Sequence, residues 1–275
     1  MSDPTRDAIR LLQIGCGNMG GALLDAAISA DILDQSVVID PRATRDDLPP
    51  YIRLLPDIAQ LPTRFRADIL MLAVKPQMIA DLAPVIASYR HQAVVVSIMA
   101  GVTMDRLAAL FGADTPILRT MPNTPAAIRR GLSALMVNDY VTQSQRDLTA
   151  QLFGAAGATV WLKDETHFDA FTGLAGSGPA YLFHLVEAME AAGLAAGLDA
   201  ETAKICARET VTGAAALLAE SPETPAMLRE NVTSPNGTTS AGLAALMAKD
   251  HGLTRLLTDT VLAAAERSKA LARGE

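Results

Sequence analysis

The sequence is poor in the residue types that mark disulfide-rich, metal-binding or aromatic-rich proteins. Of its 275 residues, two are cysteine, four are histidine and 4% are aromatic. The two cysteines, Cys16 and Cys206, cannot build a disulfide framework, and the histidines are too scattered for a metal-ligand pattern. We therefore expect no metal site, and a core built mostly from Ala, Leu, Val and Ile.

An excess of positive charge and a long uninterrupted apolar run are also missing. The chain has 23 Lys and Arg against 30 Asp and Glu, a net charge of −7, which argues against a nucleic-acid partner. Asp3 and Asp7 lie where a secretory signal would carry positive charge, and glycines, a proline and a histidine interrupt the uncharged stretch 170–186. We expect a cytoplasmic protein with no membrane association.

The first part of the chain alternates short β-branched or apolar runs with helical patterns. Such alternation predicts an α/β fold with a parallel sheet covered on both faces. The expected strands are 9–14, 37–39, 69–74, 93–97, 116–118, 132–137 and 159–162. The expected helices between them are 18–30, 76–89, 104–111 and 144–156.

The strand patterns stop after Lys163, and Ala-rich helical segments follow. The expected helices are 179–196, 200–220, 225–232, 239–249 and 253–272. We predict two domains, an α/β domain over 1–164 and an all-α domain over 165–275. The second is so apolar that it indicates association between subunits. A bundle that buries its apolar residues within one chain is the alternative.

A glycine-rich turn predicts the first functional site. Gly15, Gly17 and Gly20 follow a strand and open a helix, which is the setting of a dinucleotide-binding loop. The first glycine permits a tight turn, the second lets the backbone approach a pyrophosphate, and the third allows close packing of helix on strand. The alternative is a glycine turn that binds no nucleotide.

The end of the second strand gives conflicting evidence on the nucleotide. Asp40 stands where an acidic residue binds the ribose diol of NAD. Arg42 and Arg45 follow at once, where guanidinium groups bind the 2′-phosphate of NADP. We leave NADH and NADPH open.

Two further segments follow strands at the edge where ligands bind in open α/β sheets. Lys75 ends the segment 73–76, and Asn123 and Thr124 lie between two prolines in the segment 121–125. A stiff loop with an amide and a hydroxyl suits a nicotinamide or a substrate. A solvent-exposed lysine and a plain connecting loop are the alternatives.

Two motifs belong to the helical part. The glycine cluster 173–181 predicts either a hinge between domains or a wall of the active site. The polar segment 231–239 precedes an apolar helix, and hydroxyls with free N–H groups at a helix start bind small carboxylates. Simple capping of that helix by Ser and Thr is the alternative.

Taken together, these segments resemble pyrroline-5-carboxylate reductase. The resemblance extends from Ile14 to beyond Thr239, and its motifs occur in the expected order at 15–20, 73–76, 121–125, 176–181 and 233–239. It implies a Rossmann domain followed by a helical dimerisation domain, with a homodimer whose substrate lies between the nicotinamide and the helices. Some members of this family assemble dimers into larger rings. The implied reaction reduces the cyclic imine 1-pyrroline-5-carboxylate to L-proline with NADH or NADPH, the last step of proline biosynthesis.

The resemblance also implies roles for individual residues. The implied cofactor-binding residues are Gly15, Gly17, Asn18, Met19, Gly20, Asp40, Arg42, Ala73, Lys75, Asn123 and Thr124. The implied substrate-binding residues are Ser234, Gly237, Thr238 and Thr239. Thr239 is the candidate catalytic residue, through a hydroxyl that orients the imine and relays a proton. Asn236 replaces the glycine of many relatives, which a left-handed backbone would tolerate.

Three other functions compete with this reading. Another two-domain dehydrogenase would oxidise a hydroxy acid, but this chain has no lysine between Lys163 and Lys204, where some such enzymes have a catalytic lysine. A nucleotide-sensing protein would bind the cofactor without reducing an imine. A reductase of the six-membered imine differs by one methylene, which a pocket discriminates by only about 1–3 kcal/mol.

Overall fold

The computed structural model describes residues 8–90 and 93–273. These residues form two compact units. The first contains the residues up to 176 together with those from 264 onward, and the second contains residues 177–263. Each unit is described here by itself.

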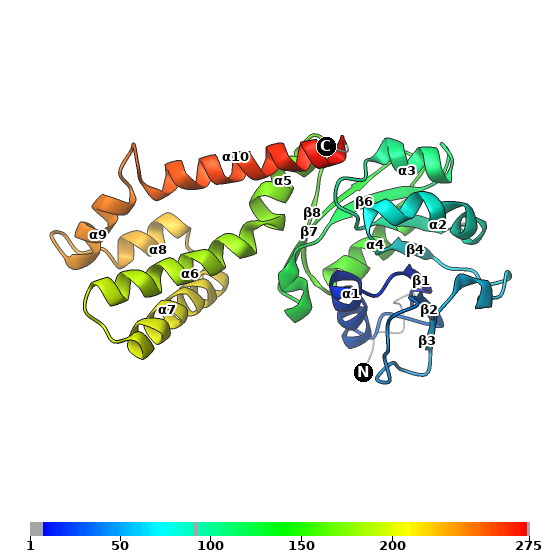
Figure 1. The fold of residues 1–275 in the computed structure, drawn as a ribbon, viewed down its shortest axis with the longest axis horizontal. Coiled ribbons are helices and arrows are strands. Elements are labelled where there is room, and N and C mark those ends of the chain that lie inside the picture. The colour runs from blue at the N-terminus through cyan, green and yellow to red at the C-terminus, as the bar shows by residue number, and fades with distance from the viewer. Residues whose placement is uncertain (1–7, 91–92, 274–275) are drawn as a thin grey trace. The chain divides into compact units, whose positions relative to one another are not determined.

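The first unit is built on one eight-stranded sheet (Figure 1). Its spatial order is β3-β2-β1-β4-β5-β6-β7-β8. The strands are β1 (Leu11–Ile14), β2 (Ser36–Ile39), β3 (Ile52–Leu55), β4 (Ile69–Leu72), β5 (Val94–Ser97), β6 (Ile117–Met121), β7 (Gly131–Val137) and β8 (Gly157–Trp161). β1 is the third strand in this order and pairs in parallel with β2 and β4, so the chain reverses its order at β1.

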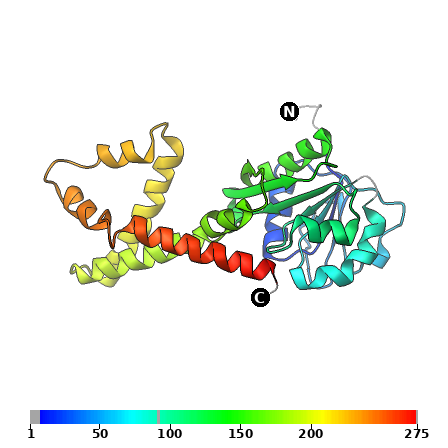
Figure 2. The ribbon, with the colours of Figure 1, turned by 90° about the horizontal axis from the view of Figure 1, so that it is seen from above.

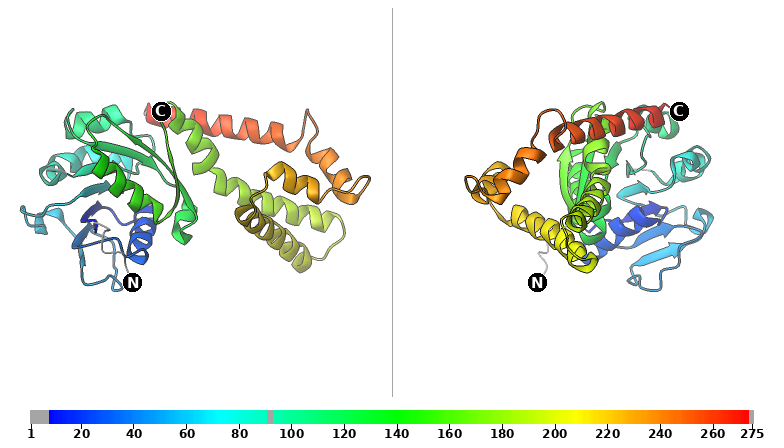
Figure 3. Two further views of the ribbon diagram at one scale, coloured as in Figure 1. Left: turned by 180° about the vertical axis from the view of Figure 1, so that it is seen from behind. Right: turned by 60° about the vertical axis from the view of Figure 1, so that its left-hand side comes forward.

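Helices cover both faces of this sheet (Figure 2 and Figure 3). One apolar cluster joins the sheet to α1 (Asn18–Ser29) and α4 (Gln143–Gly154). The other joins it to α2 (Ile79–Ile86) and α3 (Met104–Phe111). Because side chains alternate along a strand, Leu11 packs on the α1 side of β1 while Leu12 and Ile14 pack on the α2 side.

Two features of the sheet differ from the sequence prediction. β7 runs antiparallel to β6, whereas a wholly parallel sheet was expected. The two strands are joined by a short 3₁₀ turn, η4 (Thr124–Ile128), and a parallel connection would need a longer crossover. The edge strand β3 was not predicted at all, because its four residues lie between prolines and include the exposed Arg53.

The expected helix over 76–89 is divided into three pieces. A 3₁₀ turn, η2 (Pro76–Met78), precedes α2, and another, η3 (Ala87–Tyr89), follows it. Pro84 lies inside α2, where it has no N–H to donate to the preceding turn. A further 3₁₀ turn, η1 (Ile58–Gln60), follows β3.

The chain leaves the sheet through a short helix and a π-helical turn. α5 (His167–Phe171) is followed by η5 (Thr172–Gly176), so the glycine cluster begins as a π turn. The Arg119 guanidinium of β6 pairs with the Glu165 carboxylate and lies 4.2 Å from the ring centroid of Phe168. Glu165 also accepts the Met104 N–H at 2.8 Å. These contacts fix the start of α5 against β6 and α3.

The second unit is wholly helical. Its helices are α6 (Gly178–Ala195), α7 (Ala200–Glu220), α8 (Pro225–Asn231), α9 (Thr238–Leu246) and the first half of α10 (Leu253–Ala272). α6 and α7 pack closely at Gly193, where a Cβ would lie only 3.2 Å from the Ala203 Cβ. The absence of a side chain on Gly193 permits this approach. Within the described residues, no helix is long and apolar enough to span a membrane.

Candidate dinucleotide site and substrate loop

The glycine-rich loop joins β1 to α1 by a close approach to β4. Gly15 has φ = 95°, and a Cβ on it would lie 2.5 Å from the Ala73 carbonyl oxygen. A Cβ on Gly20 would lie 3.0 Å from the Ala73 Cβ. Gly15 therefore requires glycine for its backbone angle and for space, whereas a methyl group at Gly20 would force its close neighbours to shift.

Gly17 has the opposite surroundings. It is the N-cap residue of α1, its φ is −72°, and a Cβ on it would meet no atom within 4 Å. It also has no side chain to cap the first N–H groups of α1, which belong to Asn18, Met19 and Gly20. The residues present thus fit a dinucleotide: open space lies in front of uncapped N–H groups at a positive helix end, as a pyrophosphate requires.

A cavity of 530 Å³ extends from this loop along the carboxyl ends of β1, β2 and β4. Six of the predicted cofactor-binding residues line it: Gly15, Gly17, Asp40, Arg42, Ala73 and Lys75. Its remaining lining is largely apolar and includes Ile58, Met78 and Leu82. An apolar hollow of this kind beside a phosphate-binding loop suits an adenosine group.

Asp40 directs its carboxylate to the protein itself. Oδ2 accepts the Cys16 N–H at 2.7 Å, and Oδ1 accepts the Arg42 N–H at 2.8 Å and the Ala43 N–H at 3.2 Å. Burial raises the pKa of Asp40, but the three backbone N–H groups outweigh burial and hold it below its usual 3.8. With three acceptor positions occupied, the carboxylate has little capacity left for a ribose diol.

The two arginines after β2 differ in their partners. The Arg45 guanidinium bonds Asp25 at 2.6 Å and Asp47 at 2.7 Å, and these carboxylates raise its pKa. Arg42 is exposed and lines the cavity, and no ion pair of its side chain occurs among the described residues. Arg42 is therefore the better placed of the two for a 2′-phosphate.

The thiol inside the loop is an unreactive one. Cys16 packs against the α1-side core, and burial raises the pKa of its thiol. A protonated, half-buried thiol is a small apolar side chain, and it leaves the loop's backbone to do the binding.

The loop after β6 holds its amide in internal contacts. Asn123 Nδ2 donates to the Ala175 carbonyl at 3.0 Å, and Asn123 Oδ1 accepts the Leu132 N–H at 2.8 Å. The side chain thus joins this loop to the π turn η5 and to β7. Thr124 is exposed at the start of η4, and Lys75 is exposed before η2. Asn123 Oδ1 and Nδ2 therefore position the loop.

The predicted substrate loop lies in the helical unit and opens α9. Gly237, not a serine or threonine, is the N-cap residue, and no side chain caps the helix. The Gly237 N–H donates to the Ser234 carbonyl at 3.0 Å, and Asn236 has φ = 58°, the left-handed backbone its position requires. The alternative of simple capping by hydroxyls is thus wrong for α9. Ser234, Thr238 and Thr239 are all exposed beside its free N–H groups.

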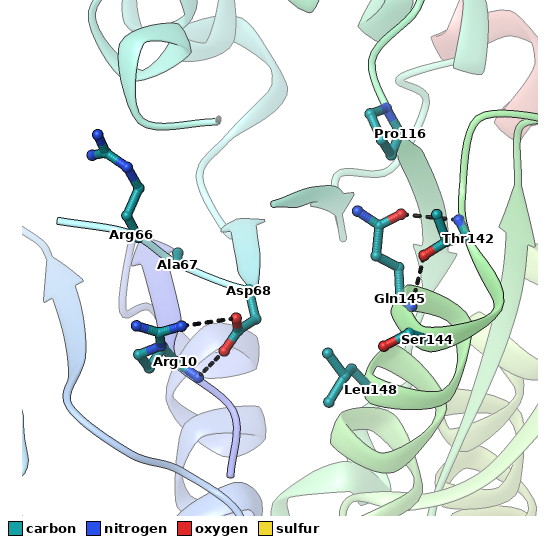
Figure 4. Close-up of a pocket in the computed structure, with 9 residues that line it drawn as sticks. All are labelled: Arg10, Arg66, Ala67, Asp68, Pro116, Thr142, Ser144, Gln145 and Leu148. Carbon is teal, nitrogen blue, oxygen red and sulfur yellow. Dashed lines mark hydrogen bonds and ion pairs between the residues drawn. The ribbon is translucent and has the colours of Figure 1, made fainter. Parts of the chain in front are cut away.

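A larger hollow of the first unit lies at the opposite end of the strands. Its volume is 1040 Å³, and Figure 4 shows Arg10 bonded to Asp68 on one side and Thr142 bonded to Gln145 on the other. Arg10, Asp68 and Thr142 directly precede β1, β4 and α4, and Gln145 lies in the first turn of α4. Dinucleotides bind at the carboxyl ends of parallel strands, so the smaller cavity beside Gly17 is the candidate site. Among residues 8–90 and 93–273, no cluster of three or more His, Cys, Asp or Glu could hold a metal.

Comparison with known proteins assigns the two parts of the chain separately. The family of pyrroline-5-carboxylate reductase dimerisation domains matches residues 165–271. The family described as NADP oxidoreductase coenzyme F420-dependent matches residues 11–101. The chain thus carries a dimerisation domain after a nucleotide-binding domain.

Several relatives that align over most of this chain are pyrroline-5-carboxylate reductases. The pyrroline-5-carboxylate reductase of Haemophilus influenzae is 35% identical over 88% of this chain and 90% of its own, and that of Synechocystis is 35% identical over 95% and 100%. The solved structure of the Coxiella burnetii enzyme is 30% identical and matches with a TM-score of 0.87 over 96% of this chain and 99% of its own. The Plasmodium falciparum enzyme, solved with NADP bound, is 26% identical and matches with a TM-score of 0.80 over 96% and 98%. The chain therefore belongs to the pyrroline-5-carboxylate reductase family, the NAD(P)H-dependent oxidoreductases of proline biosynthesis.

Proposed function

We propose that the cavity beside Gly17 binds NAD(P)H and that the loop Ser234–Thr239 binds the carboxylate of 1-pyrroline-5-carboxylate. The observation that carries the substrate assignment is the N-terminus of α9, where Gly237 is the N-cap and, among the residues that the structure describes, no side chain caps the first N–H groups. Free N–H groups at a helix start hold a small carboxylate without an arginine. The cofactor assignment rests on the six predicted residues that line the cavity, Gly15 and Gly17 among them.

The chemistry needs little from the protein beyond orientation. Bound NAD(P)H supplies the hydride for the C=N bond. The chain's residues hold the substrate carboxylate, exclude water from the reacting carbon and keep a hydroxyl near the imine nitrogen. An imine is basic enough to arrive protonated or to take a proton through a hydroxyl and water, so no histidine or lysine acid is required.

Thr239 is the proposed source of that hydroxyl. It is exposed in the first turn of α9, next to the N–H groups that hold the carboxylate. The hydroxyl is a weak acid, so its role is to orient the imine nitrogen and to relay a proton from water. Ser234 and Thr238 supply further hydroxyls for the carboxylate oxygens.

NADPH is the proposed favoured cofactor. The Asp40 carboxylate accepts three hydrogen bonds from backbone N–H groups, and Arg45 forms ion pairs with Asp25 and Asp47. Of the two arginines after β2, it is Arg42 that lines the cavity, and its positive charge could pair with a 2′-phosphate.

The working form is proposed to be a cytoplasmic homodimer. Large apolar side chains on the helical unit are exposed in the single chain, among them Phe183, Leu217 and Val232. A second copy covering them through residues 165–275 would remove this surface from water. Rings of such dimers would need further surface outside that interface.

Thr239 variants with both cofactors test the proposal. NADPH and NADH oxidation are followed at 340 nm with 1-pyrroline-5-carboxylate at matched concentrations. Thr239→Val is expected to lower kcat/KM by about 10²-fold, the size of one proton-transfer contribution, and Thr239→Ser to restore most of it. Both variants should bind NADPH as the parent does. Unchanged kcat/KM in folded Thr239→Val would refute the role, and no turnover by the parent would refute the substrate.

A further inference from the structure

The strand that leads into the glycine-rich loop contains one buried amide. Gln13 of β1 has 0% exposure and lies between the apolar residues Leu12 and Ile14. Its side chain shares the α1 face of the sheet with Leu11. No role in the proposed reaction accounts for a polar side chain in this strand.

The amide nitrogen of Gln13 connects the two ends of the loop. Nε2 donates to the Gly15 carbonyl at 2.8 Å and to the Gly20 carbonyl at 3.1 Å. Gly15 is the first residue after the strand, and Gly20 lies in the first turn of α1. One side chain therefore fixes the distance between the end of β1 and the start of α1.

The same amide leaves an unsatisfied atom in the core. Gln13 Oε1 is buried, and no partner for it occurs within the described part of the chain. A buried acceptor without a partner destabilises a fold, and a methionine or leucine of similar volume would avoid that cost. The unpartnered oxygen thus offsets the stabilisation that the two hydrogen bonds to Gly15 and Gly20 provide, so stability alone gives little reason for glutamine at this position.

The direction of the two bonds supplies a reason. Because the carbonyl groups of Gly15 and Gly20 are bound from beneath the loop, the N–H groups at the start of α1 keep a fixed orientation toward the open space in front of Gly17. The Asp40 carboxylate also holds the loop, by accepting the Cys16 N–H. A binding loop held in place before its ligand arrives loses less entropy on binding.

We infer that Gln13 is a positioning residue for the dinucleotide, which holds the glycine-rich loop in its binding conformation at the expense of fold stability. This inference rests on the proposed function only in taking NAD(P)H as the ligand of the loop. Because Gln13 is fully buried and does not line the cavity, its expected effect is on cofactor affinity and not on the hydride step.

The test compares affinity with stability in the full-length protein. Gln13→Met and Gln13→Leu remove both hydrogen bonds and the unsatisfied oxygen. The Kd of NADPH, measured by titrating nicotinamide fluorescence, is expected to rise about tenfold, as the loss of two hydrogen bonds would give. The Tm of the cofactor-free protein should stay level or rise, and kcat at saturating NADPH should stay within about twofold.

Thr149→Val is the matched control. Thr149 is also fully buried, on α4, and its hydroxyl donates to the Gln145 and Arg146 carbonyls at 2.9 Å. This variant should lower the Tm and leave the Kd of NADPH unchanged. An unchanged Kd in both folded Gln13 variants would overturn the inference, as would a fall in Tm that accompanies the loss of affinity. Because Kd is measured without the imine, a failure of the proposed reaction in the parent enzyme is a separate result.

Discussion

The two units of this chain differ in how they bury apolar residues. In the first unit, both faces of the sheet are covered, and β1, β2, β4 and β5 are buried along their whole lengths. In the described residues between 177 and 263, the buried hydrophobic side chains are Ala203 and Ala207 alone. Leu182, Phe183, Leu217 and Leu218 are about half exposed or more in the single chain.

This difference separates two ways of completing a core. The first unit is completed by its own chain, and its loops are then available for ligands. The helical unit forms its α-helices but leaves large apolar side chains exposed to water in the single chain. Its stability is expected to depend on a second copy, and thus on protein concentration.

The largest expected effect comes from placing a charge on that apolar surface. Leu217→Asp on α7, where Leu217 is 57% exposed in the single chain, should convert the dimer to monomer and abolish most activity. A carboxylate buried without a partner costs about 3 kcal/mol or more. Light scattering after gel filtration, over a range of protein concentrations, measures the change.

Val85→Asp is the control from the other unit. Val85 on α2 is 50% exposed, nearly as much as Leu217. The substitution should change the free energy of unfolding by no more than about 0.5 kcal/mol and leave the assembly intact. Equal effects of the two substitutions would remove the distinction between the units.

The second prediction separates fold from cofactor within the first unit. Gly17→Ala should leave the cofactor-free Tm level or slightly raised, since its backbone is extended and its Cβ is unobstructed. It should weaken NADPH binding by about tenfold or more, because the methyl group would occupy the space for the pyrophosphate. Gly15→Ala, with its positive φ and close carbonyl, should instead lower the Tm. Thermal melts with and without NADPH measure both, and a stable, tightly binding Gly17→Ala would contradict the site.

Much of this fold was predictable because its signals are local. The segments 104–111, 200–220 and 253–272 were expected as helices and occur with those bounds. The strands were recognisable as β-branched runs of the length that a buried parallel strand needs. β3 and the direction of β7 were not, because β3 is a short segment between prolines with an exposed arginine, and the direction of β7 is set by the short turn that joins it to β6.

Six of the predicted cofactor-binding residues line one cavity, but not all of their contacts could be predicted. The spacing of Gly15 and Gly17 and the position of Asp40 indicated the cavity that they line. The spacing did not reveal that Asp40 accepts the Cys16 N–H or that both polar atoms of the Asn123 amide are hydrogen-bonded, since these partners come from other segments of the chain. For Gln13 a signal was available: one glutamine in an apolar strand directly before the loop.

The third prediction concerns the cofactor, which the first unit is proposed to recognise by its own residues. Arg42→Ala should lower kcat/KM for NADPH about tenfold and leave that for NADH unchanged, as the loss of one exposed charged contact to a 2′-phosphate would give. The KM for the imine should not change. Arg45→Ala is the control, since Asp25 and Asp47 already hold that guanidinium. A larger loss of NADPH activity from Arg45→Ala would show that Arg45, and not Arg42, binds the 2′-phosphate.

The smallest effect is a pH dependence that belongs to the first unit. The pKa of Asp40 lies below its usual 3.8 in the folded chain, because three backbone N–H groups favour its charged form over the penalty of burial. Its contribution to stability is therefore complete at pH values above the unfolded-state pKa and disappears as the pH falls through the folded-state pKa. Asp40→Asn should cost less than about 1 kcal/mol at neutral pH, because the group is partly exposed and screened, and the deficit should shrink in acid.

Urea unfolding of Asp40→Asn and of the parent, at several pH values between about 3 and 7, measures this deficit. Asp46→Asn, at an exposed position in the segment that follows β2, is the control. The deficit should also be independent of protein concentration, since Asp40 stabilises contacts within one chain, whereas the loss in Leu217→Asp should vary with concentration. A deficit that stayed constant down to pH 3 would mean that the charge of Asp40 does not contribute and that the variant differs from the parent only in the shape of the side chain. The backbone of the glycine-rich loop would then be held without the charge, and Gln13 would be left as its main support.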